Sequence, residues 1–392
     1  MDAFYRTHRN LVENIDYHVE RLLMQEIDWS QPLIGIKGSR GVGKTSFLLA
    51  YARQFLNDER SCLYINLNSF YFTQRSLINF ADEFYKKGGR ILLIDQVYKY
   101  PDWSHELRFI NENYPELKVV FTGSSVMRLK EENPDLYGKV ASYNLRGFSF
   151  REYINDKTNL GFPAFDLDSI LKDHKQLARE ITSKVRPLAY FQDYIHHGYY
   201  PFYLEKSNFS ENLLKTMNMM LEIDITLLKQ IELKYLPKLR QLLYLISQDA
   251  PATPNVSKLS TQIKTSRATV SNYIKYLKDA RLVNLLYPIN EDFPKKPDKV
   301  YLHNTNLAFA IDRDYSNPQI LNETFLYNML HKDHKINSGT LKNPFIVDQK
   351  INFDVSQNAR STEKNSDIIY AVDMIEKGNE NIIPLWLFGF LY

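Results

Sequence analysis

The sequence predicts an α/β fold with a parallel sheet over residues 31–155, followed by a mainly helical region and a small α+β region. Three observations support this division. Short apolar runs alternate with amphipathic stretches up to residue 155, which is typical of strand–helix–strand units. The pattern becomes helical over 156–235 and is helical and basic over 236–290. After a charged segment at 291–299 that contains two prolines, residues 300–392 mix helix with short strands.

The individual elements follow from apolar periodicity. A helical segment is expected over residues 1–30, with the helix itself at Phe4–Ile27. The five apolar runs that predict strands are Leu33–Lys37, Cys62–Leu67, Ile91–Asp95, Lys118–Thr122 and Ala141–Leu145. Amphipathic helices are expected at Ser46–Phe55 and Leu77–Tyr85. Further on, Glu152–Lys234 is helical with interruptions near Gly198 and Pro201, and Pro237–Leu285 is helical with a loop at Ala250–Pro254.

Composition and charge restrict the class of protein. With 392 residues, 44% hydrophobic and 24% charged, the chain is ordinary for a globular protein of two to four domains. The net charge is only +3, but residues 236–290 hold eight Lys or Arg against two Asp, so that segment carries +6 and favours an acidic partner. The single cysteine, Cys62, excludes an intramolecular disulfide framework. No secretory signal is visible, and the longest apolar run, Ile382–Tyr392, has about half the length that spans a bilayer. We therefore expect a cytoplasmic protein without a membrane partner.

A phosphate-binding motif lies between the first expected strand and the first expected helix. Residues 38–45, GSRGVGKT, match the pattern G-x-x-x-x-G-K-[ST] in full. Its glycines allow backbone N–H groups to surround the phosphates, Lys44 reaches the β- and γ-phosphates, and the Thr45 hydroxyl binds magnesium. The alternative is a chance match in a glycine-rich turn. The motif predicts ATP or GTP with Mg²⁺, and the expected nucleotide contacts are Gly38, Ser39, Arg40, Gly41, Val42, Gly43, Lys44, Thr45 and Ser46.

A carboxylate ends the buried strand Ile91–Asp95. Ligands of open α/β sheets bind beyond the carboxyl ends of the strands, so Asp95 is expected beside the phosphate loop, where it supports magnesium together with Thr45. A simple turn residue is the alternative. Gln96 follows at the position where a glutamate activates the attacking water in many ATPases. An amide orients water but does not accept its proton, so we expect slow hydrolysis, with no hydrolysis as the alternative.

The strand Lys118–Thr122 is followed by Gly-Ser-Ser. A hydroxyl at its end, from Thr122 or Ser124, is expected to contact the γ-phosphate or the attacking water, the alternative being a Ser/Thr-rich turn. Lys139 and Arg146 are candidates for a cation on the γ-phosphate, and each is equally well explained as a surface charge. The expected catalytic residues are Lys44, Asp95, Gln96 and Ser124.

Four segments together resemble a known family. GSRGVGKTS, RILLIDQVYKYPDWSHELR, KVVFTGSS and LRGFSFREYI are similar to segments of the AAA-type P-loop ATPases of the archaeal-ATPase-like group, which usually carry LLIDEVHKYPNW, TGSS and LSFREFL. The resemblance implies ATP as the nucleotide, the strand order 5-1-4-3-2, a helical lid at 156–235, a winged helix at 236–290 and a restriction-endonuclease-like domain at 300–392. The sequence departs from the family at Gln96, where glutamate is usual, and at Tyr98, where histidine is common. Both departures argue against rapid hydrolysis.

The basic block has the pattern of a helix–turn–helix followed by a strand. A short helix, Ser257–Lys264, precedes a turn with Ser266 as N-cap, and a second helix is expected at Arg267–Ala280. Its apolar positions Val270, Ile274 and Leu277 are spaced to face inward. The opposite positions suit phosphate contacts with double-stranded DNA, whereas a protein-packing module is the alternative. The residues expected to contact DNA are Arg267, Thr269, Ser271, Asn272, Lys275 and Lys278.

The last region lacks a complete nuclease signature. The family's nuclease-like domains hold magnesium with two acidic residues and a lysine, and the acidic candidates here are Glu323, Asp348 and Asp354. Asn358 occupies the expected lysine position, and the upstream acidic position is Asn343 or Pro344. We therefore expect a domain without nuclease activity. The leading hypothesis is an ATP-dependent switch that acts on DNA or a protein partner, itself included. The alternative is a nucleotide-binding scaffold that does not hydrolyse ATP and works through protein–protein contacts.

Overall fold

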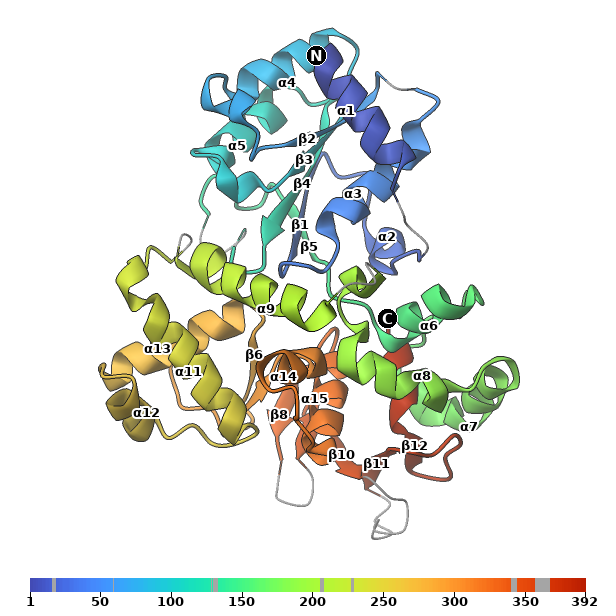
Figure 1. Cartoon of the computed structure of the whole chain (residues 1–392). Coiled ribbons are helices and arrows are strands. Elements are labelled where there is room, and N and C mark those ends of the chain that lie inside the picture. The colour runs from blue at the N-terminus through green and yellow to red at the C-terminus, as the bar shows by residue number, and fades with distance from the viewer. Residues whose placement is uncertain are drawn as a thin grey trace. The chain divides into compact units, whose positions relative to one another are not determined.

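The computed structural model has two compact units, Met1–Gly147 and Phe148–Tyr392 (Figure 1). It describes the whole chain except residues 16–18, 59, 128, 130–132, 205–207, 227–228, 340–343 and 357–366. Within these described ranges, no helix combines the length and the apolar character that a membrane crossing requires.

The first unit is built on a five-stranded parallel sheet. Its strands are β1 (Leu33–Gly38), β2 (Cys62–Asn66), β3 (Ile91–Asp95), β4 (Lys118–Ser124) and β5 (Ala141–Asn144). They run in the order β2-β3-β4-β1-β5, and every neighbouring pair is parallel. This is the predicted order 5-1-4-3-2 seen from the other edge, and each predicted strand lies within two residues of the observed one. The three central strands are almost completely buried, which explains why they were visible as continuous apolar runs.

Helices cover both faces of this sheet. Figure 1 shows α1 (Asp2–Glu13) and α3 (Lys44–Ala52) on one face, with α4 (Leu77–Lys86) and α5 (Trp103–Asn113) on the other. Short 3₁₀ turns complete the unit at Arg53–Phe55, Phe70–Thr73 and Val97–Lys99. The prediction of one helix over Phe4–Ile27 was wrong, because α1 ends at Glu13 and the next helix among the described residues is the short α2 (Leu23–Glu26). The Asn14 side chain bonds to the Asn10 carbonyl at 2.8 Å, a local bond that competes with continuation of the helix.

The second unit begins with helices. These are α6 (Phe150–Thr158), α7 (Leu167–Lys184), α8 (Pro187–Asp193) and α9 (Phe209–Met219), with π-helical turns at η4 (Tyr194–Gly198) and η6 (Met220–Ile225) and 3₁₀ turns at Pro201–Leu204 and Leu233–Tyr235. The interruptions predicted near Gly198 and Pro201 are therefore present. A π-turn leaves backbone carbonyls without their usual helical donors. In η4 the buried Asn306 side chain donates to the carbonyls of Tyr194 and Ile195, at 3.1 and 2.8 Å.

Three helices and a hairpin form the basic segment. They are α11 (Leu236–Asp249), α12 (Val256–Gln262), α13 (Arg267–Asp279) and the antiparallel pair β6 (Val283–Leu286) and β7 (Lys299–Leu302). Ser266 caps α13, accepting a bond from the Thr269 N–H at 3.1 Å, as expected. The charged segment 291–299 lies between the two paired strands, so it is a hairpin loop and not a linker between separate units.

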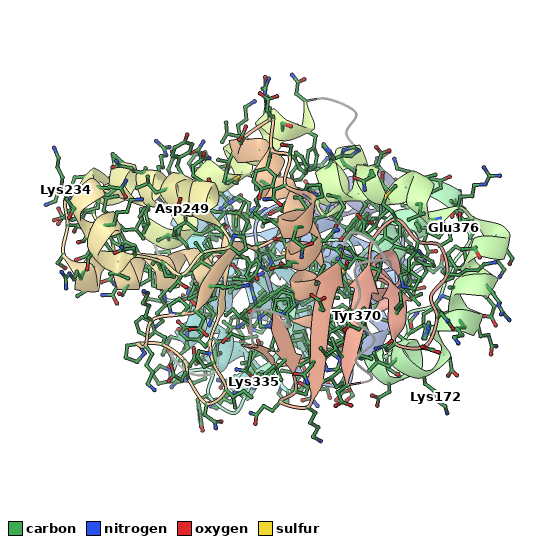
Figure 2. All side chains as sticks on the ribbon, turned by 90° about the horizontal axis from the view of Figure 1, so that it is seen from below. Lys172, Lys234, Asp249, Lys335, Tyr370 and Glu376 are labelled. Carbon is green, nitrogen blue, oxygen red and sulfur yellow. The ribbon has the colours of Figure 1, made fainter. Side chains whose placement is uncertain are left out.

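The chain ends in a mixed sheet flanked by helices. After α14 (Thr305–Ile311) and α15 (Pro318–Leu330) come β8 (Ile336–Ser338), β9 (Phe345–Val347), β10 (Ile351–Ser356), β11 (Ile368–Val372) and β12 (Ile382–Pro384), in the order β12-β11-β10-β9-β8. Strands β10, β11 and β12 are parallel, whereas β8, β9 and β10 are antiparallel. Figure 2 looks onto this sheet, with the buried Tyr370 labelled on β11. The final apolar run forms β12 and a 3₁₀ helix at Leu385–Phe390.

Candidate nucleotide site

Backbone conformation shapes the loop between β1 and α3. Gly41 and Gly43 have φ angles of 85° and 91°, in the left-handed region that only glycine adopts without strain. Gly43 is the N-cap of α3, so the helix begins at Lys44 with its free N–H groups facing the loop. Gly38 is needed for a different reason, since a Cβ there would lie 2.5 Å from the Leu145 carbonyl oxygen. The loop therefore has the backbone that the motif predicts.

The Lys44 side chain curls back over this loop. Its ammonium group donates to the carbonyl oxygens of Gly38 and Ser39, both at 2.8 Å. These contacts hold a positive charge at the centre of the loop, next to the N-terminus of α3. A cation and helix N–H groups at one point form a suitable environment for a phosphate group.

Asp95 accepts hydrogen bonds from three hydroxyl groups. Thr45 Oγ1 and Tyr64 Oη donate to its Oδ2 at 2.7 and 2.9 Å, and Thr122 Oγ1 donates to its Oδ1. The donors come from α3, β2 and β4, which meet at the carboxyl end of β3, and Asp95 is only 1% exposed. Thr45 and Asp95, the predicted magnesium residues, are thus in direct contact. Their hydroxyl and carboxylate oxygens are the hard donors that Mg²⁺ prefers.

Tyr64 was not identified from the sequence. Burial, and then the negative charge of Asp95, raise the pKa of its hydroxyl far above the ordinary value of 10. The group therefore remains a hydrogen-bond donor to the carboxylate throughout the physiological range. The only signal in the sequence was a tyrosine within an apolar strand, whose hydroxyl needs a buried partner. Which partner it finds depends on the β2–β3 pairing.

Gln96 has a strained backbone beside this carboxylate. Its φ angle is 59°, in the left-handed region that is uncommon for residues other than glycine. Its N–H donates to Thr122 Oγ1 at 2.9 Å, so Thr122 links Gln96 to Asp95. Thr122 is fully buried and occupied by these two bonds. Ser124, the other residue predicted to contact the γ-phosphate or the attacking water, ends β4 directly opposite Gly38, at the start of the phosphate loop.

The two predicted γ-phosphate cations lie in different surroundings. Lys139 is exposed and forms an ion pair with Glu112 of α5. Arg146 accepts a bond at its backbone oxygen from the buried Arg21, which also donates to the Val42 carbonyl at 3.1 Å. Arg21, which the sequence did not single out, therefore connects the phosphate loop with the segment after β5. On the other side of the loop, Arg40 donates to the Tyr98 hydroxyl at 3.0 Å.

The predicted DNA residues on α13 are not equally accessible. Val270, Ile274 and Leu277 are buried, as predicted. Four of the six polar side chains have local contacts: Thr269 with Ser266, Ser271 with the Arg267 carbonyl, Lys275 with the Phe293 ring at 4.6 Å, and Lys278 with Asp292 at 4.0 Å. Arg267 and Asn272 are exposed.

The acidic candidates of the last region fall into two places. Glu323 is buried and accepts bonds from Tyr301 at 2.7 Å and Gln319 at 3.0 Å. Burial raises the pKa of Asp354, and the nearby charge of Glu323 adds to this effect. Asp348 lies elsewhere, bonded to His334 at 2.6 Å. Asn343 and Asn358 lie outside the described residues. In the part that the structure describes, no group of three His, Cys, Asp or Glu side chains is placed to hold a metal ion.

Comparisons with known proteins identify two segments. Residues 30–154 match the family model described as "AAA domain" (AAA_14), and residues 188–317 match "Domain of unknown function" (DUF8612). The first segment, with its parallel sheet and phosphate loop, is therefore an AAA-type P-loop domain.

One curated relative and several solved structures are similar to the chain. The uncharacterized protein MJ1637 of Methanocaldococcus jannaschii is 24% identical over 293 residues, which is 71% of this chain and 60% of that protein. The chain thus spans about 60% of the length of this relative. Aeropyrum pernix Orc1 in complex with DNA has 12% identity and a TM-score of 0.31, covering 78% of this chain and 91% of that one. AMPPCP-bound DnaA from Aquifex aeolicus has 14% identity and a TM-score of 0.26, covering 70% and 87%. Caenorhabditis elegans PCH-2 has 14% identity and a TM-score of 0.24, covering 71% and 66%. TM-scores this low carry no functional inference.

Proposed function

We propose that the chain binds ATP with Mg²⁺ at the loop 38–45 and acts as a nucleotide-dependent switch that hydrolyses ATP slowly. The contact of Thr45 Oγ1 with Asp95 Oδ2 at 2.7 Å is the observation that carries this proposal. It places the hydroxyl and the carboxylate that support magnesium in P-loop ATPases side by side, next to Lys44. The family match of residues 30–154 supports the same function.

Each residue of the loop has a separate task in this proposal. Backbone N–H groups at the start of α3 bind phosphate oxygens, and Lys44 neutralises charge on the β- and γ-phosphates. Mg²⁺ would be held by the Thr45 hydroxyl with the support of the Asp95 carboxylate, and would supply a compact positive charge that offsets the charge of the phosphates. Tyr64 and Thr122 keep the Asp95 carboxylate in place. Ser124, opposite Gly38, is proposed to contact the γ-phosphate.

Gln96 is the reason that we propose slow turnover. Its amide is able to orient a water molecule but not to accept a proton from it. The Thr122 hydroxyl fixes the Gln96 backbone at 2.9 Å, so the side chain starts from a defined position beside Asp95. The competing function is a scaffold that binds ATP without hydrolysing it. Gln96 also favours this function, because its amide does not accept a proton from water.

Phosphate release by four proteins distinguishes these functions. Wild type is expected to release phosphate slowly, Lys44→Ala to lose Mg-ATP binding at the loop 38–45 together with phosphate release, and Gln96→Glu to exceed the wild-type rate of phosphate release by at least tenfold. Gln74→Glu, which makes the same change at an exposed position of the same unit, is the control and should match wild type. A silent wild type that becomes active with Gln96→Glu supports the scaffold. Failure of the folded wild type to bind Mg-ATP in calorimetry would refute both functions.

Contact with duplex DNA through α13 is a second proposal, limited to a smaller surface than the sequence predicted. Arg267 and Asn272 are exposed on the capped first turns of this helix. A duplex titration at low and moderate salt tests it, with Arg267→Gln expected to reduce the slope of log affinity against log salt by about one. Lys172→Gln, an exposed cation on α7 (Figure 2), is the matched control. Absence of binding at low salt would eliminate this proposal.

A further inference from the structure

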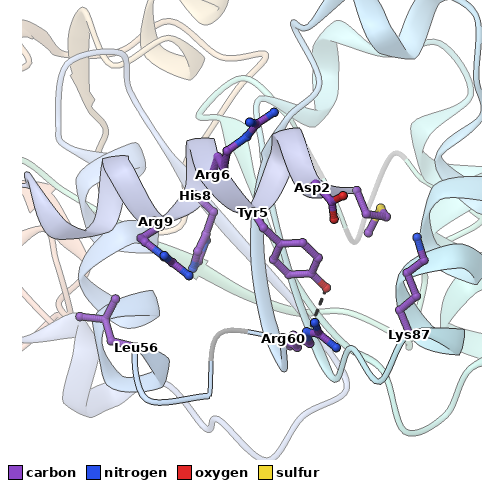
Figure 3. Close-up of a pocket in the computed structure, with 9 residues that line it drawn as sticks. Asp2, Tyr5, Arg6, His8, Arg9, Leu56, Arg60 and Lys87 are labelled. Atoms are coloured by element: carbon purple, nitrogen blue, oxygen red, sulfur yellow. Dashed lines mark hydrogen bonds between the residues drawn. The ribbon is translucent and has the colours of Figure 1, made fainter.

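A cationic cavity lies on the first unit, away from the phosphate loop (Figure 3). It has a volume of about 540 Å³ and is lined by one side of α1 together with the segments after α3 and α4. Arg60 lies just before β2 begins, and Lys87 lies four residues before β3 begins. The cavity is therefore at the amino ends of these strands, whereas the phosphate loop is at the carboxyl end of β1. It is a separate site from the one proposed for ATP.

Positive charge dominates the lining. Arg6, Arg9, Arg60 and Lys87 contribute four cations, and Asp2 is the single carboxylate among the described lining residues. Neither Arg6 nor Arg60 forms an ion pair with any residue that the structure describes. Lys87 pairs with Glu83 at 2.8 Å, but its side chain is still 53% exposed and keeps donors available. When Asp2 and Glu83 are set against the four cations, an excess of two positive charges remains among these described residues, and it attracts an anion.

Tyr5 and His8 also line the cavity. Figure 3 shows the Tyr5 hydroxyl close to Arg60, whose carbonyl oxygen it contacts at 3.5 Å. Burial raises the pKa of Tyr5, so this hydroxyl stays a neutral donor. At the inner wall, His8 Nδ1 accepts the Tyr64 N–H at 3.0 Å. The cations counted above are three arginines and a lysine, whose charge does not depend on pH near neutrality.

The shape favours a small ligand over a nucleic acid. Cations on an ordinary solvated surface point apart, whereas Arg9, Arg60 and Lys87 come from three separate segments of the chain and line one hollow. Its volume is in the range of small-molecule sites. Nucleic acids instead track along extended grooves with successive stacking aromatics.

We propose that this cavity binds a small polyphosphate anion, of the class that includes inorganic tripolyphosphate and the phosphate chain of a nucleotide. Arg60 and Lys87 are the phosphate contacts that we expect from the segments before β2 and β3, with Arg9 lining the cavity from α1. The proposal is independent of ATP binding at the loop 38–45.

Calorimetry with inorganic tripolyphosphate tests the site, using the full chain with Lys44→Ala as the background so that the phosphate loop is weakened in every sample. One tripolyphosphate per chain is expected to bind. Arg60→Gln and Lys87→Gln should each weaken binding about tenfold, because each removes a charge-assisted bond. Lys86→Gln is the matched control: Lys86 is the neighbouring exposed lysine and pairs with Asp82 at 2.7 Å, but it does not line the cavity. It should change affinity less than twofold.

Three results would overturn the proposal. The first is no tripolyphosphate binding in the Lys44→Ala background, with circular dichroism showing a folded protein. The second is equal affinity for Lys86→Gln and Lys87→Gln, which would mean that binding does not occur in this cavity. The third is a single-stranded oligonucleotide that binds more tightly than tripolyphosphate and loses affinity with Arg60→Gln, which would assign the cavity to nucleic acid. A repeat with ADP in place of tripolyphosphate shows whether a nucleotide or only the inorganic anion is accepted.

Discussion

Replacement of Tyr64 by phenylalanine tests the hydroxyl cluster around Asp95. The change removes one oxygen and leaves the aromatic ring in place. Tyr64 donates to Asp95 Oδ2 at 2.9 Å, and the carboxylate is 1% exposed, so water does not replace the lost donor. A hydrogen bond to a charged group contributes about 1.5–3 kcal/mol. We expect the free energy of unfolding of the first unit to fall by about this amount.

The expected loss is measurable by thermal unfolding. For a unit of the size of Met1–Gly147, each kcal/mol lowers the melting temperature by about 2–4 °C, so Tyr64→Phe should melt roughly 3–12 °C below wild type. Tyr85→Phe is the matched control, because it removes a hydroxyl that donates to Glu116 at 3.2 Å on the exposed surface. Tyr85→Phe should change the free energy of unfolding by no more than about 0.5 kcal/mol.

The same variant has a second consequence if the proposed function holds. With one donor missing, the Asp95 carboxylate is less well oriented toward Thr45 and magnesium. ATP affinity in the presence of Mg²⁺ should fall about tenfold, while affinity in EDTA should not change. Equal melting temperatures for Tyr64→Phe, Tyr85→Phe and wild type would refute the structural reasoning, whatever the nucleotide data show.

Three other predictions follow from buried groups. Asn306→Ala removes two bonds to carbonyls of the π-turn η4 and one from the Tyr199 N–H, so urea denaturation should show a loss of about 2–4 kcal/mol. Asn14→Ala, an exposed control, should change the free energy of unfolding by less than about 0.5 kcal/mol. Equal losses in Asn306→Ala and Asn14→Ala would contradict a stabilising role for the Asn306 bonds to η4. Burial raises the pKa of Cys62 to about 12, so iodoacetamide at pH 8 should label it only after unfolding; labelling of the native protein at the rate of a free thiol would show that the strand is open. Burial also raises the pKa of the Tyr51 hydroxyl to about 12, above its value of 10 in the unfolded chain. The contribution of protonated Tyr51 to the free energy of unfolding is therefore complete below pH 10, and it declines as the pH rises to 12. In Tyr51→Phe, the free energy of unfolding should therefore fall less steeply between pH 10 and pH 12 than in wild type. An unchanged slope would contradict the raised pKa of Tyr51.

The phosphate loop was predictable because its chemistry is local. The roles proposed for Gly41, Gly43, Lys44 and Thr45 depend on backbone conformation and short-range spacing, and both are encoded within one continuous motif. Strands β1 to β4 were predictable for a related reason. A parallel strand buried on both faces must be apolar along its whole length, so its boundaries are visible without knowing its neighbours. The order of the strands came from the family resemblance and is confirmed by the structure.

The helical break after Glu13 and the loop between β6 and β7 were not predictable in the same way. Apolar periodicity continues through the Phe4–Ile27 segment, and the competing side-chain bond of Asn14 is too weak a signal to end a helix in a sequence pattern. The charged residues at 291–299 have the composition of a linker. Only the pairing of Val283 with Leu302 shows that they close a hairpin.

Sequence alone indicated the residues that we propose for phosphate and magnesium binding, because the motif that contains most of them is defined by spacing along the chain. Tertiary structure decided which distant groups support them. Tyr64 reaches Asp95 because β2 pairs with β3, and Arg21 reaches Val42 across a separation of 21 residues. The cationic cavity likewise brings Arg9, Arg60 and Lys87 together from three segments. Such contacts depend on long-range packing, which leaves no periodic pattern in the sequence.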